Sequence, residues 1–215
     1  MSVILFQGDS ITDCSRSRDI VNTHPQNPAM SGAGYANLLS GQIKYKYPER
    51  MYDCINRGIS GHRVVDLYAR WKIDALNLNP ELISILIGVN DVWHEKSRAN
   101  GVEPERFELI YRMMLEWTKK VLPEVKLVIM EPFALRTEEV VTEDFFNDVK
   151  VLAAISRKIA GEFDAVFVPL QDKFDAAAKL APNTYWLFDG VHPTVAGHQM
   201  IAEAWMNAAG KLLER

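Results

Sequence analysis

Five short apolar runs, rich in β-branched residues, recur along the chain, and each precedes a longer segment with helical period. Four of the runs lack the regular alternation of a half-exposed strand, which predicts strands buried on both faces. Such strands belong to parallel sheets covered by helices on both sides. The runs are Val3–Phe6, Met51–Ile55, Leu82–Ile87, Val125–Met130 and Ala165–Val168.

The segments between the runs carry apolar residues at intervals of three and four, as amphipathic helices do. We expect the last helix to begin near Pro193, because a proline is well tolerated in a first helical turn. Strand followed by helix, five times over, predicts a three-layer α/β/α sandwich with a five-stranded parallel sheet. The other predicted helices are Tyr35–Tyr47, His62–Leu78, Glu105–Leu122 and Asp144–Glu162.

The whole chain, 1–215, is expected to form a single domain, because no stretch of it resembles a linker. Its 24 basic and 28 acidic residues give a net charge of −4, which provides no global positive field for nucleic acid. No apolar stretch approaches the ~18 residues of a membrane span. The N-terminus also lacks the basic region of a signal peptide. We therefore expect a cytoplasmic protein without nucleic-acid or membrane partners.

Small and polar residues follow the predicted strands, at the sheet edge where open α/β folds bind ligands. Ser10 lies one short turn past the first run and follows Gly8, which would expose its hydroxyl at this edge. A serine becomes an effective nucleophile when a base takes its proton. The candidate base is His192. Asp189, three residues earlier, would hold one ring nitrogen while the other faces Ser10.

Three donors are candidates to stabilise the anionic oxygen of an ester undergoing attack. They are the N–H of Ser10, the N–H of Gly58 and the side-chain amide of Asn90. Each residue alone has a commoner explanation, since serine, glycine and asparagine are frequent in caps and turns. Their common position after predicted strands favours a catalytic site.

Two other features leave alternatives open. Cys14 and Cys54 do not make a disulfide framework or a zinc site by themselves, and small buried side chains are the simplest interpretation. Asp13–Gly34 is a long irregular segment, and such segments are usually functional or mobile. Its Arg16 and Arg18 either lie over the site or are simply solvated, and the sequence favours solvated side chains.

Four short blocks follow one another along the chain: Gly8-Asp9-Ser10-Ile11, Gly58, Gly88-x-Asn90-Asp91 and Asp189-x-x-His192. Together they resemble the conserved blocks of the GDSL, or SGNH, hydrolases, with isoleucine where the family name has leucine. The resemblance covers the whole chain and implies a flavodoxin-like fold. It also implies Ser10 as nucleophile, Asp189 and His192 as its triad partners, and Gly58 and Asn90 as oxyanion donors. It implies no cofactor and no metal.

Longer stretches around these blocks resemble one bacterial branch of the family, which includes intracellular acetylxylan (acetyl-xylooligosaccharide) esterases. This resemblance implies acetylated xylo-oligosaccharides as substrates and is the ground for expecting a homo-oligomer. Trp93, three residues past Asn90, is expected to form an aromatic wall beside the nucleophile, with packing at a helix start as the alternative. The stretches are Gly8–Arg16, Asn56–Gly61, Ala69–Trp71, Gly88–Trp93 and His192–His198.

The leading functional hypothesis is a serine esterase that removes acetyl groups from small carbohydrates. A lipid or thioester hydrolase, similar to lysophospholipases, is the alternative within the same superfamily. Such an enzyme would use an apolar lid or an amphipathic surface, and no such segment is evident. A carbohydrate-binding protein without turnover is a third hypothesis, although every residue that the chemistry needs is present.

Overall fold

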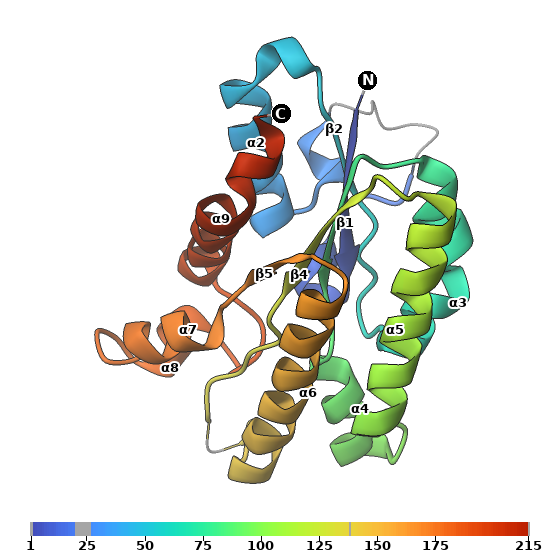
Figure 1. The fold of residues 1–215 in the computed structure, drawn as a ribbon. Coiled ribbons are helices and arrows are strands. Elements are labelled where there is room, and N and C mark those ends of the chain that lie inside the picture. The colour runs from blue at the N-terminus through green and yellow to red at the C-terminus, as the bar shows by residue number, and fades with distance from the viewer. Residues whose placement is uncertain (1, 20–26, 138, 215) are drawn as a thin grey trace.

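The computed structural model describes residues 2–19, 27–137 and 139–214, and it confirms the predicted architecture. Five parallel strands form one sheet in the order β2-β1-β3-β4-β5 (Figure 1). This is the flavodoxin-like order: β2 lies on one side of β1, and β3, β4 and β5 follow on the other, so the strand order reverses at β1. The strands are β1 (Val3–Gly8), β2 (Asp53–Asn56), β3 (Leu82–Leu86), β4 (Lys126–Met130) and β5 (Val166–Val168).

Helices cover both faces of the sheet (Figure 1). On one face, α2 (Tyr35–Lys46) packs against α9 (Val195–Ala209). On the other, α5 (Pro104–Val121) contacts both α3 (Val64–Asp74) and α6 (Glu143–Glu162). None of the helices in the described ranges is long and apolar enough to cross a membrane. The remaining helices are α1 (Ser10–Asp13), α4 (Val89–Arg98), α7 (Gln171–Ala177) and α8 (Asn183–Trp186).

Strand burial differs in one respect from the sequence-based expectation. The inner strands β1, β3 and β4 are buried almost throughout, whereas β2 alternates and β5 is partly exposed. Three runs rather than four are therefore buried on both faces. The reason is position: β2 and β5 are edge strands, which have a neighbour on one side only.

Two helix boundaries and one additional helix also differ from the sequence-based expectation. Pro193 does not open α9, because Thr194 caps that helix by accepting the N–H of Gly197 at 3.3 Å. Pro193 instead pairs with Leu187 in an isolated antiparallel bridge. The predicted helix over 62–78 ends at 74 and is followed by a separate 3₁₀ turn. Helix α4, which periodicity did not predict, begins directly after β3 and carries Asn90.

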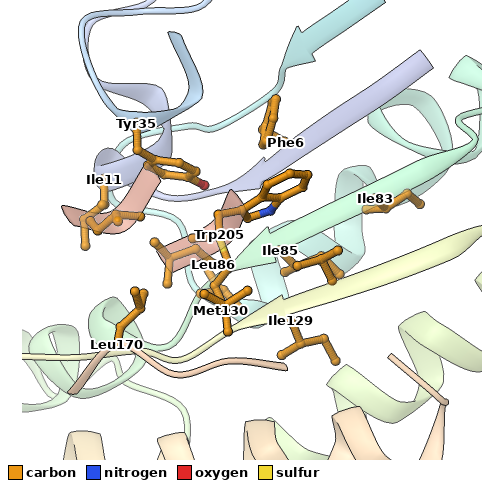
Figure 2. Packing of buried hydrophobic residues seen from close by; sticks show 14 of the residues in the cluster. Phe6, Ile11, Tyr35, Ile83, Ile85, Leu86, Ile129, Met130, Leu170 and Trp205 are labelled. Carbon is orange, nitrogen blue, oxygen red and sulfur yellow. The ribbon is translucent and has the colours of Figure 1, made fainter. Parts of the chain in front are cut away.

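Aromatic side chains from the α2–α9 layer meet the sheet in the core (Figure 2). The ring of Phe6 in β1 lies edge-on to Tyr35 and to Trp205, at centroid distances of 6.1 and 6.2 Å. The indole N–H of Trp205 donates to Ser84 Oγ in β3 at 3.0 Å, so its polar group is satisfied despite full burial. This packing fixes α9, and with it the segment that precedes α9, against the strand that leads to Ser10.

Candidate active site

The end of β1 and the segment before α9 bring three of the predicted residues together. Ser10 Oγ lies 2.9 Å from His192 Nε2, although 182 positions separate the two residues. His192 Nδ1 lies 2.7 Å from Asp189 Oδ2. A hydroxyl, an imidazole and a carboxylate in this order form the arrangement in which a base accepts the hydroxyl proton and a third group orients the base.

Local geometry explains the position of Ser10. A Cβ at Gly8 would lie 2.3 Å from the carbonyl oxygen of Leu86, so only glycine allows β1 to approach β3 this closely. Asp9 then caps the short helix α1, because its Oδ1 accepts the N–H of Ile11 at 3.0 Å. Ser10 is the first residue of α1, and a first helical N–H has no acceptor within its own helix. Both the hydroxyl and the N–H of Ser10 are thus presented at the sheet edge.

A tight turn fixes Asp189 relative to His192. Gly190 adopts a φ of +89°, a conformation that favours glycine. Asp189 Oδ1 accepts the backbone N–H of Val191 at 2.9 Å and that of His192 at 2.8 Å. The second carboxylate oxygen therefore remains directed at the imidazole ring.

The electrostatics of the pair favour a charged Asp189. The hydrogen bond that His192 makes with Asp189 raises the pKa of His192, although burial acts in the opposite direction. Burial by itself would raise the pKa of Asp189, but the hydrogen bonds from the His192 ring and from two backbone N–H groups lower it. With Nδ1–H donating to the carboxylate, the neutral imidazole presents Nε2 as an acceptor to Ser10.

Two aromatic rings lie against the His192 imidazole. Phe188 stacks on it at a centroid distance of 5.5 Å and an interplanar angle of 16°. Trp93 lies 5.8 Å away at 55° and packs edge-on against Phe145. The structure thus places Trp93 beside the imidazole, on α4. Phe188 was not predicted from the sequence, where the only sign of its role is that this large apolar residue directly precedes Asp189.

The structure does not support Gly58 as an oxyanion donor. Its N–H donates to Asn56 Oδ1 at 2.8 Å in a buried hydrogen bond, so it is already occupied. The glycine serves packing instead, because a Cβ at position 58 would lie 2.4 Å from the backbone nitrogen of Asp13. Asn90, by contrast, lies at the start of α4, and its Nδ2 has a single bond, at 3.2 Å to the carbonyl oxygen of His62.

Gly61, in the same loop as Gly58, has an uncommitted N–H that sequence reasoning missed. Among the residues that the structure describes, none accepts a hydrogen bond from this group. A Cβ at Gly61 would meet no atom within 4 Å, and its φ is +81°. Hydrogen bonds on both sides of Gly61 fix the position of this loop: Ile59 N–H donates to Gly8 O at 3.1 Å, and Asn90 Nδ2 donates to His62 O. The sequence shows that Gly58 and Gly61 lie three residues apart, but it does not show which of their backbone N–H groups lacks an acceptor.

Two buried carboxyl groups support these loops. Asp91 accepts the N–H of Val64 at 3.0 Å, and Asp9 caps α1. Burial raises the pKa of Asp9 to about 7 and raises that of Asp91 well above its ordinary value. Neither group hydrogen-bonds to Ser10 or His192, so they act as structural supports of the site.

Within the described residues, no cluster of histidine, cysteine and acidic side chains is arranged to hold a metal ion. Cys14 Sγ lies 3.5 Å from Nε2 of His198, whose Nδ1 accepts the N–H of Tyr35 at 3.1 Å. Cys54 is buried, as expected. Of the segment Asp13–Gly34, residues 20–26 lie outside the described residues.

The chain is similar to known esterases over nearly its full length. A model of the GDSL-like lipase/acylhydrolase family matches residues 6–200. An acetylxylan esterase of Geobacillus stearothermophilus is 34% identical, with 96% of this chain and 93% of the relative covered.

Solved structures agree with these matches. A proposed GDSL-like lipase from Parabacteroides merdae superposes with a TM-score of 0.91 at 41% identity, covering 97% of this chain and 95% of its own. A mutant of the acetyl-xylooligosaccharide esterase from Geobacillus superposes with a TM-score of 0.87 at 31% identity, with coverages of 97% and 94%.

Proposed function

This chain belongs to the GDSL-like lipase/acylhydrolase family and is a carboxylic ester hydrolase, and from that premise we propose a Ser10–His192–Asp189 mechanism. The observation that carries this proposal is the hydrogen-bonded series from Ser10 Oγ through the imidazole to the Asp189 carboxylate. Ser10 Oγ attacks the acyl carbon while His192 Nε2 takes its proton. His192 then protonates the departing alcohol. The same nitrogen next deprotonates a water molecule, whose oxygen attacks the acyl carbon; the bond to Ser10 Oγ breaks, and His192 returns the proton to Oγ as the acid is released.

Three donors would bind the oxyanion of the tetrahedral intermediate. We assign this role to the N–H of Ser10, the N–H of Gly61 and Nδ2 of Asn90. The N–H of Gly58 is replaced in this set because it is committed to Asn56. Preformed donors contribute most where charge develops in the transition state, since no solvent has to reorganise around the new charge.

Replacing Asn90 with alanine is expected to lower kcat by roughly 10²–10³-fold, with a smaller effect on KM. The amide would bind an oxygen that becomes anionic only in the transition state. Steady-state kinetics with p-nitrophenyl acetate measure both constants, and Asn147→Ala, on an exposed part of α6, is a matched control. A change confined to KM would place Asn90 in ground-state binding instead.

The pH profile of kcat/KM is expected to rise and then level off, with its midpoint above the ordinary histidine pKa of ~6.5. His192 must be neutral to accept the proton of Ser10, and its bond to Asp189 raises its pKa. Activity is therefore low below that pKa and full above it. Rates from pH 5 to pH 9 measure the midpoint. Full activity of His192→Ala at pH 8 would show that the base is misassigned.

We propose that the substrate is a short acyl ester of a small carbohydrate, with acetylated xylo-oligosaccharides as the best candidates. The similar esterase from Geobacillus is an acetyl-xylooligosaccharide esterase, which supports this class. Trp93, against the imidazole, would limit the length of the acyl group. Each extra CH₂ that clashes there costs as much as the ~0.8 kcal/mol that burial of one contributes elsewhere.

A series of p-nitrophenyl esters tests this proposal. We expect kcat/KM to fall steeply from acetate to butyrate to octanoate, and acetylated xylobiose to be deacetylated faster than any lysophospholipid. Trp93→Ala should flatten the chain-length dependence, because it removes the ring that limits the acyl group. A series that peaks at eight carbons or more would support the lipid-hydrolase alternative and contradict the proposal.

A further inference from the structure

Arginine side chains gather beside the loop that joins β2 to α3. Arg16 and Arg57 flank Gly58 of this loop, and Arg18 and Arg70 lie nearby. Arg18 pairs with Asp13 at 2.7 Å, and Arg70 pairs with Asp74 at 3.1 Å. No other carboxylate among the described residues forms an ion pair with these four arginines. The cluster therefore holds an excess of positive charge in a chain of net charge −4.

Arg57 is the least satisfied member of this cluster. Its side chain is only 17% exposed, and its Nε lies 4.0 Å from Asp74 Oδ1, beyond hydrogen-bond range. Its guanidinium donates no hydrogen bond to any residue that the structure describes. A guanidinium has five N–H donors, and no nitrogen of Arg57 is among the buried atoms that lack a partner, so its donors remain within reach of solvent and of a ligand. Such a group is suited to an anion that arrives from outside.

Arg16 adds a second positive charge beside the same loop. Its Nε donates to the carbonyl oxygen of Gly58 at 2.9 Å, which holds the side chain against the loop. Burial lowers the pKa of Arg16, and the positive charges of Arg57, Arg18 and Arg70 lower it further, while Asp13 opposes the shift. Arginine stays protonated in proteins, so this repulsion persists until an anion relieves it.

The cluster is connected to the loop that leads to the nucleophile. Arg57 N–H donates to the carbonyl oxygen of Phe6 in β1 at 2.8 Å, and Ile59 N–H donates to that of Gly8 at 3.1 Å. Arg70 Nη2 also lies 3.4 Å from Gly8 O. Gly8 precedes Ser10 by two residues. A ligand held by Arg16 and Arg57 would thus lie on the β2 side of Ser10.

We propose that Arg16 and Arg57 bind a carboxylate on the alcohol half of the ester, so that the enzyme selects acetylated oligosaccharides carrying an acidic sugar. This inference rests on the proposed carbohydrate esterase function. An acetyl group carries no charge, so the anion must belong to the alcohol half. The planar guanidinium matches a carboxylate in a paired hydrogen-bond geometry, which a point charge does not.

Competition between two substrates provides the test. Acetylated xylo-oligosaccharides with and without a glucuronic acid side group are offered to the native enzyme, Arg57→Gln, Arg57→Lys and Arg50→Gln. Arg50 is an exposed arginine before β2, at the opposite end of the sheet, and serves as the matched control. The readout is the ratio of kcat/KM for acidic over neutral substrate, which cancels any general loss of activity.

We expect kcat/KM of the native enzyme to be roughly tenfold or more higher for the acidic substrate, which is the size of effect that a hydrogen bond to a charged group produces. The ratio should approach one in Arg57→Gln, be partly kept in Arg57→Lys and stay unchanged in Arg50→Gln. Added salt should lower it in the native enzyme. A native ratio near one, or an equal fall in Arg50→Gln, would overturn the proposal.

Direct binding separates this proposal from the esterase function. Titration of the native protein with D-glucuronate and with its neutral analogue D-glucuronamide needs no catalysis. Tighter binding of the glucuronate, lost in Arg57→Gln, would support the carboxylate site even if no acetylated sugar is hydrolysed. Equal binding of the two compounds would contradict the site even if the enzyme deacetylates neutral sugars.

Discussion

Ser10→Ala is expected to lower kcat/KM for p-nitrophenyl acetate by roughly 10³-fold or more while leaving the fold intact. The change removes only Oγ, the atom 2.9 Å from His192 Nε2. Another nucleophile cannot easily replace it. The nearby thiol of Cys14 contacts His198 rather than His192, and burial raises the pKa of that thiol, which keeps it protonated.

The control for this variant is Ser97→Ala, which removes a hydroxyl from the exposed end of α4. Its activity should equal that of the native enzyme. Circular dichroism and thermal unfolding verify that both variants keep the native structure. Retention of even a tenth of native activity by a folded Ser10→Ala protein would be incompatible with a serine nucleophile at this position.

Asp189→Asn is expected to lower kcat by about 10⁴-fold, the effect seen when the orienting carboxylate of a triad becomes an amide. Asp189 Oδ1 accepts two backbone N–H groups, a role that only the amide oxygen of asparagine can take over. The amide NH₂ would then face His192 Nδ1, which must become an acceptor. The ring proton moves to Nε2, where it blocks transfer from Ser10.

The geometry of the turn should survive this substitution, because the two backbone bonds are kept. The measurement is kcat for p-nitrophenyl acetate at pH 7 and pH 9, with the ¹⁵N shifts of the His192 ring reporting its tautomer. Activity within tenfold of native, or an unchanged tautomer, would show that Asp189 does not orient the base. Asp175→Asn, in α7, controls for the loss of one negative charge.

The fold followed from local patterns because each element has its own signal. The inner strands are continuous apolar runs, and helices such as α5 and α6 show apolar residues at helical spacing. Boundaries were harder to predict, because they depend on caps. Thr194 caps α9, so Pro193 lies outside the helix, and α4 begins within the block Gly88-x-Asn90-Asp91, where periodicity did not predict a helix.

The sequence predicted part of the candidate site, namely the residues that have a local signal of their own. Ser10 was found because it follows a predicted strand, and Asp189 and His192 were found because an aspartate three residues before a histidine can hold its ring. Gly58 and Gly61 could not be told apart, since the difference is a hydrogen bond from Gly58 to Asn56 that only the folded loop shows. The unsatisfied guanidinium of Arg57 likewise depends on its burial and its distance from Asp74.

The most direct test of the Ser10–His192–Asp189 mechanism is covalent trapping of the nucleophile. The native enzyme, incubated with a serine-reactive p-nitrophenyl phosphonate, should gain the mass of one phosphonyl group and lose activity in proportion. Peptide mapping should place the group on Ser10, and Ser10→Ala should remain unlabelled. An inactivated enzyme labelled at another residue, or an active enzyme that gains no label, would contradict the mechanism.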